Sequence, residues 1–520
     1  MFPQTTTKLD SPTATAGRPA PREPSSTSFE FGTAGHTPPI SPGATVPAAT
    51  SPPRIKLTSS SSGIAGLVPP AELFAPQYLS ADTTARPEKR RKLSSADADT
   101  PPVALPPSPA AQPSTLPTTT TPPAAPAFQV IILGSGGGPS ESNVSGYLIR
   151  STSTAWAPSS ILAVDAGTHL AGIVSILETT PSPPRHSLPI PHTPFAGCPL
   201  PHTTPRANAL HITQSLVATF LLTHTHLDHI SGFVINTAAF LYPHPKTLAA
   251  LPPSIDAIKT HIFNDVIWPN LSNENNGAGL VSYLRLPPAC HKYTPVATAL
   301  SVQAHPVSHG HCMKQHAHLG RLSTAGLELP QPRAHWCVLD SAVYFIRDAA
   351  SGRECMMWGD VEPDSISLDP RNREVWGLAA GKFREGLLGA VFIECSYTGV
   401  QEDAALYGHL SPRHLVRELR TLAEAVVAGP AERGVWEEAG LEECEPGYGG
   451  EPPGVENGEV EIEVRGALLG LRVVVTHVKD VMIDGRDCVT EVERELRELE
   501  SKEGLGVEFM MARRGMDVYF

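Results

Sequence analysis

One stretch of the sequence concentrates side chains that bind metal ions. From Thr223 it reads Thr-His-Thr-His-Leu-Asp-His, so His224, His226, Asp228 and His229 occupy six positions. In a loop, two imidazoles two residues apart can turn towards one cation, and the following carboxylate and imidazole can reach a second cation nearby. Nitrogen and carboxylate donors suit zinc, and also manganese or iron. This stretch therefore predicts a metal site.

A site for two ions needs further ligands, and other apolar segments end in suitable residues. His309 comes shortly after an apolar segment at 302–304, and Asp360 and His477 close Met-rich and Val-rich segments. Each of these residues alone is weak evidence, because a single histidine after a strand is more often a packing or capping residue. Together they indicate ligands placed at the ends of successive strands.

The elements that must position these residues alternate between short apolar strands, glycine-containing turns and helices. This alternation predicts an α/β or layered domain. The expected strands are 130–133, 146–149, 161–164, 216–222, 302–304, 356–358, 390–393 and 471–476, and the expected helices are 170–177, a helix starting near 412, and 488–502. The glycine loop 134–138 is neither a Gly-x-Gly-x-x-Gly motif nor a Walker motif. We therefore expect a tight turn that lets the backbone pass close to the metals.

Three segments differ from this pattern. Residues 1–126 are rich in Pro, Ser, Thr and Ala, and 25 of the 54 prolines lie within residues 1–127. Such a segment cannot bury enough apolar surface to fold, so we expect a disordered N-terminal region followed by one domain at 127–520. Within the domain, the Pro-rich stretch 181–208 indicates a surface insertion, and 429–460, with nine Glu and one Arg, indicates an acidic mobile loop.

Charge and composition limit the kinds of partner that the protein can bind and the cellular compartment in which it is expected. The net charge is −13, which argues against a nucleic-acid-binding protein, and no apolar run is long enough to span a membrane. The eight cysteines form no Cys-x-x-Cys pair and favour reduced thiols in a cytoplasmic protein. The basic cluster Lys89-Arg90-Arg91-Lys92 is either a solvated charge run or a nuclear-import signal. The oligomeric state is left open.

The His-x-His-x-Asp-His motif resembles the signature of the metallo-β-lactamase superfamily, which implies an αββα sandwich with a two-metal site. The resemblance also implies that Asp165, in Val-Asp-Ala-Gly, is structural rather than a ligand. The metals would be zinc, with manganese or iron as alternatives. The implied ligands are His224, His226 and His309 for one metal ion, Asp228, His229 and His477 for the second, and Asp360 as the bridge.

The resemblance narrows to the class II 3′,5′-cyclic-nucleotide phosphodiesterases. The segments that resemble this family occur in its order and are 223–236, 262–272, 393–397, 406–412 and 476–479. The match spans about 128–515. It implies hydrolysis of a small-molecule cyclic nucleotide, with cyclic AMP favoured, to the nucleoside 5′-monophosphate.

The same resemblance suggests the residues that carry out catalysis. His409 is the candidate proton donor to the leaving oxygen, with a helix-capping role as the alternative. Glu394 is either its hydrogen-bonding partner or a structural carboxylate. Asp228 is counted as catalytic as well as a ligand. The residues expected to shape the nucleotide pocket are Asn236, Asn264 and Trp268, with a place in the apolar core as the equal alternative for Trp268. Of the histidines near 309, namely His305, His311, His316 and His318, none is expected to be a ligand.

Two other functions remain open at this point. A nuclease that processes tRNA 3′ ends would use the same fold, but the acidic domain lacks a basic arm to hold tRNA. A scaffold that binds nucleotides without metal would lack turnover. Since every expected ligand is present in the sequence, the hydrolase is the preferred reading.

Overall fold

The structure is a computed structural model and describes residues 125–179, 193–241, 244–313, 336–429 and 463–520. Nearly all of the segment expected to be disordered, 1–126, lies outside these ranges, as does the basic cluster Lys89–Lys92. The same holds for all but the first residue of the acidic segment 429–460.

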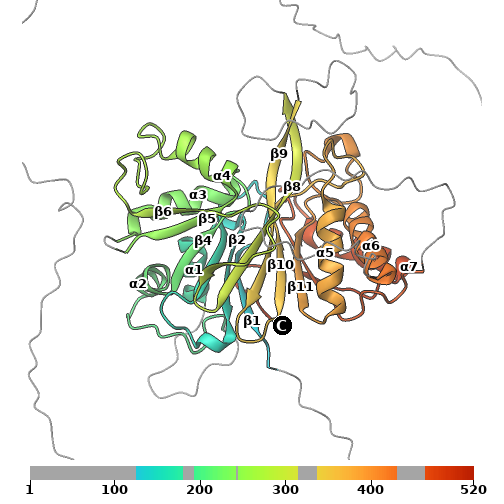
Figure 1. The fold of residues 1–520 in the computed structure, drawn as a ribbon, viewed down its shortest axis with the longest axis horizontal. Coiled ribbons are helices and arrows are strands. Elements are labelled where there is room, and N and C mark those ends of the chain that lie inside the picture. Colours follow the sequence, from blue (N-terminus) through green and yellow to red (C-terminus); the bar gives the residue numbers. More distant parts are fainter. Residues whose placement is uncertain (1–124, 180–192, 242–243, 314–335, 430–462) are drawn as a thin grey trace, which may run out of the picture. The chain divides into compact units, whose positions relative to one another are not determined.

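Two seven-stranded sheets form the centre of the described chain (Figure 1). The first sheet has the order β14-β1-β2-β3-β4-β5-β6, and β3 to β6 run parallel. Its strands are β1 (Phe128–Gly134), β2 (Gly146–Ser151), β3 (Ile161–Ala166), β4 (Val217–Leu221), β5 (Lys246–Ala250), β6 (Val281–Arg285) and β14 (Asp517–Tyr519).

The second sheet has the order β13-β12-β11-β10-β9-β8-β7, and β10 to β13 run parallel. Parallel neighbours end at the same edge of the sheet, so residues that follow β10, β11 and β12 come close together. Its strands are β7 (Thr294–Ala297), β8 (Leu300–Met313), β9 (Trp336–Asp348), β10 (Glu354–Trp358), β11 (Leu388–Glu394), β12 (Arg472–Thr476) and β13 (Glu508–Met511).

Helices cover the outer face of each sheet, so the layers are αββα (Figure 1). Tyr344 and Phe392 belong to the apolar cluster between the sheets, Phe233 to the cluster under the first helical layer, and Trp376 to the cluster under the second. The first layer contains α1 (Leu170–Thr179), α2 (Pro205–His211), α3 (Leu227–Asn236) and α4 (Pro252–Ala257), and the second contains α5 (Asn372–Arg384), α6 (Pro412–Ala428) and α7 (Cys488–Glu503). The predicted αββα sandwich is confirmed.

Strand β1 shows how the sequence produces these layers. Val130 and Ile132 belong to the cluster between the sheets, whereas Ile131 and Leu133 belong to the cluster under α1 to α4. Successive side chains of a strand point to opposite faces, so a strand covered on both faces needs apolar residues at every position. The unbroken apolar run 130–133 is therefore typical of a central, buried strand.

One expectation about local structure needs correction, and a second can be judged only in part. The strand expected at 302–304 is the beginning of β8, which continues to Met313, so His309 lies within a strand and not after it. The segment 181–208 is only partly described, and its described part contacts the core. Phe195 is buried against the ring of Trp156, and α2 begins at Pro205 with Thr204 as its N-cap. Part of the segment therefore packs against the core, although most of its described residues are exposed, and the insertion as a whole stays a prediction.

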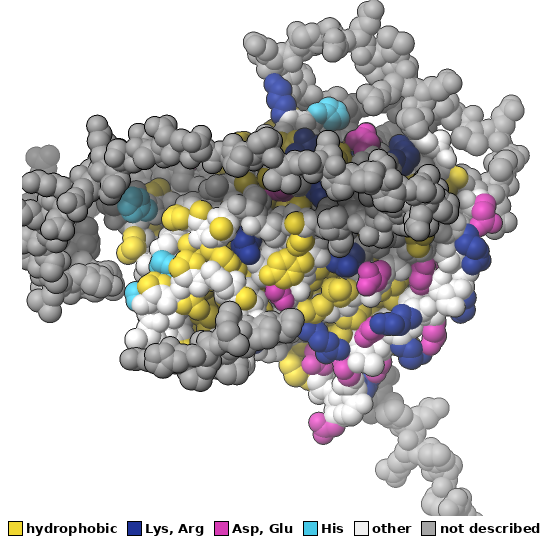
Figure 2. All heavy atoms as spheres, turned by 90° about the horizontal axis from the view of Figure 1, so that it is seen from below, with side chains coloured by type: hydrophobic (Ala, Val, Ile, Leu, Met, Phe, Trp, Pro, Cys, Tyr) yellow, Lys and Arg dark blue, Asp and Glu magenta, His cyan; other side chains and the backbone are white. Residues whose placement is uncertain are grey.

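The surface of the described residues mixes charges of both signs. On the face shown in Figure 2, basic and acidic side chains are interspersed. On α7 they form ion pairs, Arg494 with Glu498 and Arg497 with Glu493. No helix within the described ranges has the length and apolar character that crossing a membrane requires.

Candidate active site

The residues of the metal-binding motif follow β4 and lead directly into α3. His226 is the N-cap of α3, with extended backbone angles, and Asp228 lies in the first turn. A carboxylate there is favourable because the N-terminal end of a helix carries partial positive charge. The apolar strand β4 therefore ends in a turn that presents four polar side chains at one edge of the sheet.

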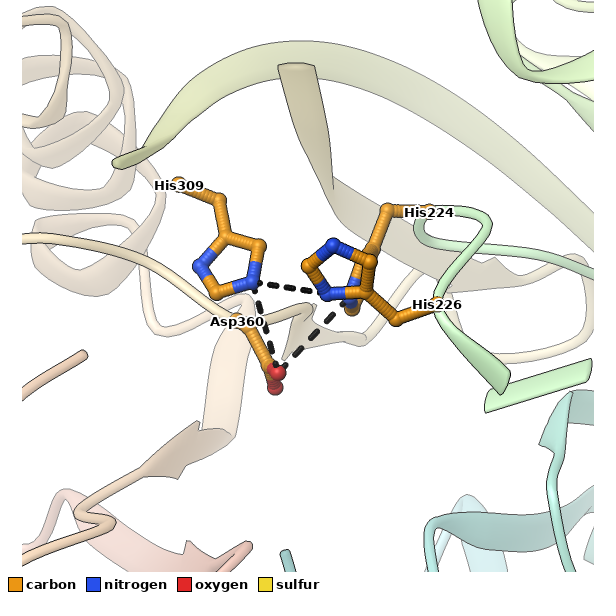
Figure 3. Close-up of side chains that lie close together, drawn as sticks. All are labelled: His224, His226, His309 and Asp360. Atoms are coloured by element: carbon orange, nitrogen blue, oxygen red, sulfur yellow. Dashed lines mark hydrogen bonds and ion pairs between the residues drawn. The ribbon is translucent and has the colours of Figure 1, made fainter. Parts of the chain in front are cut away.

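A first group of ligand atoms comes from both sheets. His224, His226, His309 and Asp360 each offer one atom, and these atoms lie within 4.8 Å of one another. Figure 3 shows their side chains pointing towards a common point. The His309 Nε2 atom is 3.1 Å from His226 Nδ1 and 3.8 Å from Asp360 Oδ2, and His224 Nε2 is 3.7 Å from Asp360 Oδ2.

A second group shares Asp360 with the first. Asp228, His229, Asp360 and His477 also offer atoms that lie within 4.8 Å of one another. The Nε2 atoms of His229 and His477 are both 3.3 Å from Asp360 Oδ2, and His477 Nε2 is 3.2 Å from Asp228 Oδ2. The seven residues proposed as ligands from the sequence are thus brought together, with Asp360 between the two groups.

Hydrogen bonds on the outer side of four imidazoles show which nitrogens are available. In each ring Nδ1 has an oxygen partner, so the neutral ring carries its proton there and Nε2 has a lone pair. The Nε2 atom of His224 is buried and has no hydrogen-bond partner among the described residues. Lone pairs that converge in this way fit divalent cations. The Nδ1 partners are Thr223 for His224, Asp165 for His229, Gly408 for His309 and Ser396 for His477.

Electrostatics agree with this assignment. Burial lowers the pKa of His224 and His309 well below the ordinary value, so both rings are neutral, as ligands must be. Burial would raise the pKa of Asp360, but His477 and His229 hold it well below its usual value. Burial would likewise lower the pKa of His229, yet Asp360 and Asp165 raise it well above 6.5. The centre therefore favours positive charge, from a proton or a cation.

Asp165 holds the motif in place. Its Oδ1 atom accepts a hydrogen bond of 2.8 Å from the backbone N–H of Thr223, and its Oδ2 atom accepts one of 2.7 Å from His229 Nδ1. It belongs to neither ligand group in the described part of the chain. The expected structural role of Asp165 agrees with these contacts.

The glycine loop after β1 joins the two sheets at this edge. The backbone N–H of His477 donates to the carbonyl of Ser135, and Gly137 donates to the carbonyl of Val478. A Cβ atom on Gly137 would lie 2.6 Å from the His477 ring. The loop is therefore a close backbone passage beside the centre, as the sequence indicated, and only glycine fits at position 137.

His409 lies beside both ligand groups and is buried. Its Nδ1 atom donates a hydrogen bond of 2.8 Å to Glu394 Oε1 and is 3.8 Å from Asp360 Oδ2. Burial would lower the pKa of His409, but Glu394 and Asp360 outweigh this effect and raise it. The predicted contact between Glu394 and His409 is present. Ser411 occupies the N-cap position of α6, so the alternative role of His409 as the cap does not apply.

Sequence reasoning missed Ser396, which connects these groups. Its hydroxyl donates to Glu394 Oε2 at 2.5 Å and accepts from His477 Nδ1 at 2.9 Å. A hydroxyl has one hydrogen, and Ser396 donates it to Glu394. The Ser396 oxygen is then left to accept from His477 Nδ1. Because the His477 proton is on Nδ1, its Nε2 lone pair faces the ligand group that contains Asp360. Ser396 lies in segment 393–397, which resembles the family, but its spacing from Glu394 does not by itself indicate this role.

Other expected pocket residues have different partners. Asn236 Oδ1 accepts from the backbone of Leu170, and Asn264 Oδ1 accepts from the backbone of residues 266 and 267. Trp268 Nε1 donates to Thr237 Oγ1 at 3.0 Å. Trp268 also packs against the apolar cluster under the first helical layer, as its alternative core role requires, and a contact of these three side chains with a nucleotide stays a prediction. His305 and His311 are in neither ligand group, and His316 and His318 lie outside the described residues.

Comparisons with known proteins agree with this geometry. The 3′,5′-cyclic-nucleotide phosphodiesterase of Schizosaccharomyces pombe is 33% identical over 300 residues, which are 58% of this chain and 76% of that protein. The 3′,5′-cyclic-nucleotide phosphodiesterase of Aliivibrio fischeri is 24% identical over 397 residues, 76% of this chain and 93% of that protein. The crystal structure of unliganded yeast PDE1 has the same fold, with a TM-score of 0.53 and 23% identity, and it covers 76% of this chain and 100% of that one.

The family described as class-II cAMP phosphodiesterases has a sequence model that matches residues 128–515. This range begins at the first residue of β1 and ends just before β14, so it includes all the other strands of the two sheets and all the residues of the two ligand groups. The chain belongs to the class-II cAMP phosphodiesterases.

Proposed function

We propose that the chain hydrolyses the 3′,5′-phosphodiester of cyclic nucleotides, with cyclic AMP preferred, to nucleoside 5′-monophosphates, and that residues 127–520 form its catalytic unit. The observation that carries this proposal is the convergence of four imidazole Nε2 atoms with two carboxylates. The names of the relatives, which are 3′,5′-cyclic-nucleotide phosphodiesterases, support the choice of substrate. The substrate is a small molecule, and the reaction requires neither nucleic acid nor a membrane.

Two divalent ions would be held by the two groups. Zinc fits this donor set, and manganese and iron(II) are the alternatives. Bound there, such ions lower the pKa of water and neutralise charge on the phosphoryl oxygens. The proposed ligands are His224, His226 and His309 for one ion, Asp228, His229 and His477 for the other, and Asp360 for both.

The side chains around these groups position the substrate and move a proton. His409, fixed through Nδ1 by Glu394, donates a proton to the 3′ oxygen as it leaves. Asp228 is proposed as a catalytic residue as well as a ligand, because it also contacts His477 Nε2 beside the reacting groups. Glu394 accepts hydrogen bonds from Val361 N, Ser396 and His409, which hold its carboxylate in place beside His409.

The test uses the full-length protein with its metals quantified. Hydrolysis of cyclic AMP and cyclic GMP is measured beside the variant His226→Ala. We expect 5′-AMP as the product, about two metal ions per chain, and loss of activity in the variant. A protein that binds metal but leaves both cyclic nucleotides intact would contradict the proposed substrate, and precursor tRNA would then be assayed as the rival substrate.

A further inference from the structure

A cavity of about 390 Å³ lies next to the candidate active site. Three loops form it: the glycine loop after β1, the segment after β11 and the segment after β12. Two lining residues contact the centre directly. Ser396 bonds His409 and His477, and Gly137 packs against the His477 ring. The cavity therefore borders residues that contact the reacting groups.

One cation in the cavity wall is available to an anion. The backbone N–H of Lys479 donates to Ser396 O, and its Nζ atom donates to Gly137 O at 3.0 Å. Two of its three N–H groups remain, and no carboxylate lies within ion-pair distance of Nζ among the described residues. Arg486, which also lines the cavity, is instead paired with Glu491. Lys479 is thus the cation best placed to meet a phosphate.

The remaining wall suits a flat heterocycle. Tyr397 is half-buried, and its ring lies 5.9 Å from the His409 ring in an edge-to-face arrangement. Pro139 and Val400 add apolar surface. Gln401 Nε2 donates to Ala405 O, so the amide is held in place while its Oε1 atom can accept from an amino group. An aromatic ring, apolar walls and one fixed amide are what a purine base requires.

We propose that this cavity binds the nucleoside end of the cyclic nucleotide, with the base against Tyr397 and the amide of Gln401, and with Lys479 beside the phosphodiester. The inference rests on the proposed function, because the phosphodiester must lie between Lys479 and His409. It assigns the cavity to a purine nucleoside. The volume agrees with such a ligand, since small-molecule sites measure from about 300 to 1,000 Å³.

The test separates the base from the phosphate by using two competitive inhibitors, adenosine and 5′-AMP, against cyclic AMP hydrolysis by the full-length protein. In Tyr397→Leu we expect the inhibition constant to rise for both, by about 5-fold to 100-fold, the range typical of base stacking. In Lys479→Met we expect it to rise for 5′-AMP and to stay unchanged for adenosine. Metal content should equal that of the unmodified protein in both variants.

Tyr407→Leu is the matched control, because Tyr407 is an exposed tyrosine of a nearby loop that does not line the cavity. Unchanged inhibition constants in Tyr397→Leu would overturn the proposal, and so would an effect confined to Tyr407→Leu. If the unmodified protein hydrolyses no cyclic nucleotide, the proposed function fails. Calorimetric binding of 5′-AMP that depends on Tyr397 and Lys479 would then still support the cavity, and its absence would refute it.

Discussion

The two halves of the molecule contribute to the site in different ways. The half built on the first sheet supplies four of the proposed ligands from one short turn, between β4 and the first residues of α3. The half built on the second sheet supplies the other three proposed ligands from separate strands or strand ends, and adds the residues that hold them. The residues from the second half are His309, Asp360, His477, Glu394, Ser396 and His409.

The difference shows which part of the site depends on local structure and which part depends on long-range structure. The turn at 223–229 needs only a strand that stops and a helix that starts. The second set forms only if β10, β11 and β12 align as parallel neighbours, so that Asp360 and His477 reach the same edge. Residues 228 and 477 are 249 positions apart, yet Asp228 Oδ2 and His477 Nε2 are separated by 3.2 Å.

The strongest test of this division removes the residue that both ligand groups share. In Asp360→Ala we expect both ions to be lost and activity to fall by more than about 1,000-fold, since metal and proton-transfer contributions disappear together. His226→Ala, which removes one ligand of the first half, should release one ion and retain the other. Metal analysis and initial rates measure both effects. Full occupancy of both sites in Asp360→Ala would refute its shared position.

His409 tests whether the second half adds chemistry as well as ligands. In His409→Ala we expect kcat to fall by about 100-fold to 10,000-fold, the usual contribution of a proton donor, with metal content unchanged. The same measurements would also reveal the alternative, in which His409 binds metal. Glu394, His409 and His477 also offer atoms within 4.8 Å of one another, so loss of metal in this variant would make His409 a ligand and not a proton donor.

Ser396 tests whether a hydroxyl outside the ligand groups directs His477. In Ser396→Ala, His477 Nδ1 loses its acceptor, and we expect metal affinity to fall by about 10-fold to 100-fold, with Ser396→Thr restoring part of it. Competition with a chelator measures the affinity. Ser411→Ala is the control, because Ser411 is also fully buried and bonds a histidine, His414, away from the centre. Equal losses of affinity in the two alanine variants would show a general packing effect.

The smallest expected effect concerns a carboxylate of the second half that lies behind the site. Burial, together with the charge of Asp364, raises the pKa of Glu418 from 4.5 to about 7. The folded protein therefore binds this proton more tightly than the unfolded chain does, and stability falls as pH rises from about 4.5 to 7. The difference between the two pKa values corresponds to at most about 3 kcal/mol.

In Glu418→Gln this loss should disappear. We expect the free energy of unfolding of the variant, relative to that of the unmodified protein, to be higher at pH 8 than at pH 5 by about 1 to 3 kcal/mol. Denaturant titrations at the two pH values measure the difference. A difference that stays the same at both values would show that Glu418 does not titrate in this range.

The division between the halves also explains what the sequence could predict. The sandwich, and the seven proposed ligands that lie together in it, could be inferred because the motif is local and because apolar segments ending in His or Asp are visible in the sequence. The length of β8 could not, since residues 305–313 alternate without a clear apolar pattern and are held by pairing with β9. The partners of Asn236, Asn264 and Trp268 could not be predicted either, because a polar group near a motif can bond to neighbouring backbone or side chains as readily as to a ligand.

Ser396 shows the remaining limit. Its role depends on three partners, Glu394, His409 and His477, and the last of these is 81 residues away. A serine two residues after a glutamate carries no chemical signal until the strands that bring the partners together are known.

The position of β14 has a consequence for aggregation. This strand contains residues 517–519 and pairs with β1, whose first residue is Phe128, so two segments far apart in the sequence complete one sheet. Phe520 stacks on Phe128, and its carbonyl accepts from the N–H groups of Ala127 and Phe128. Deletion of residues 517–520 would remove these partners and leave the backbone N–H and C=O groups along the edge of β1 unpaired, and an unpaired strand edge is a site where chains associate and aggregate.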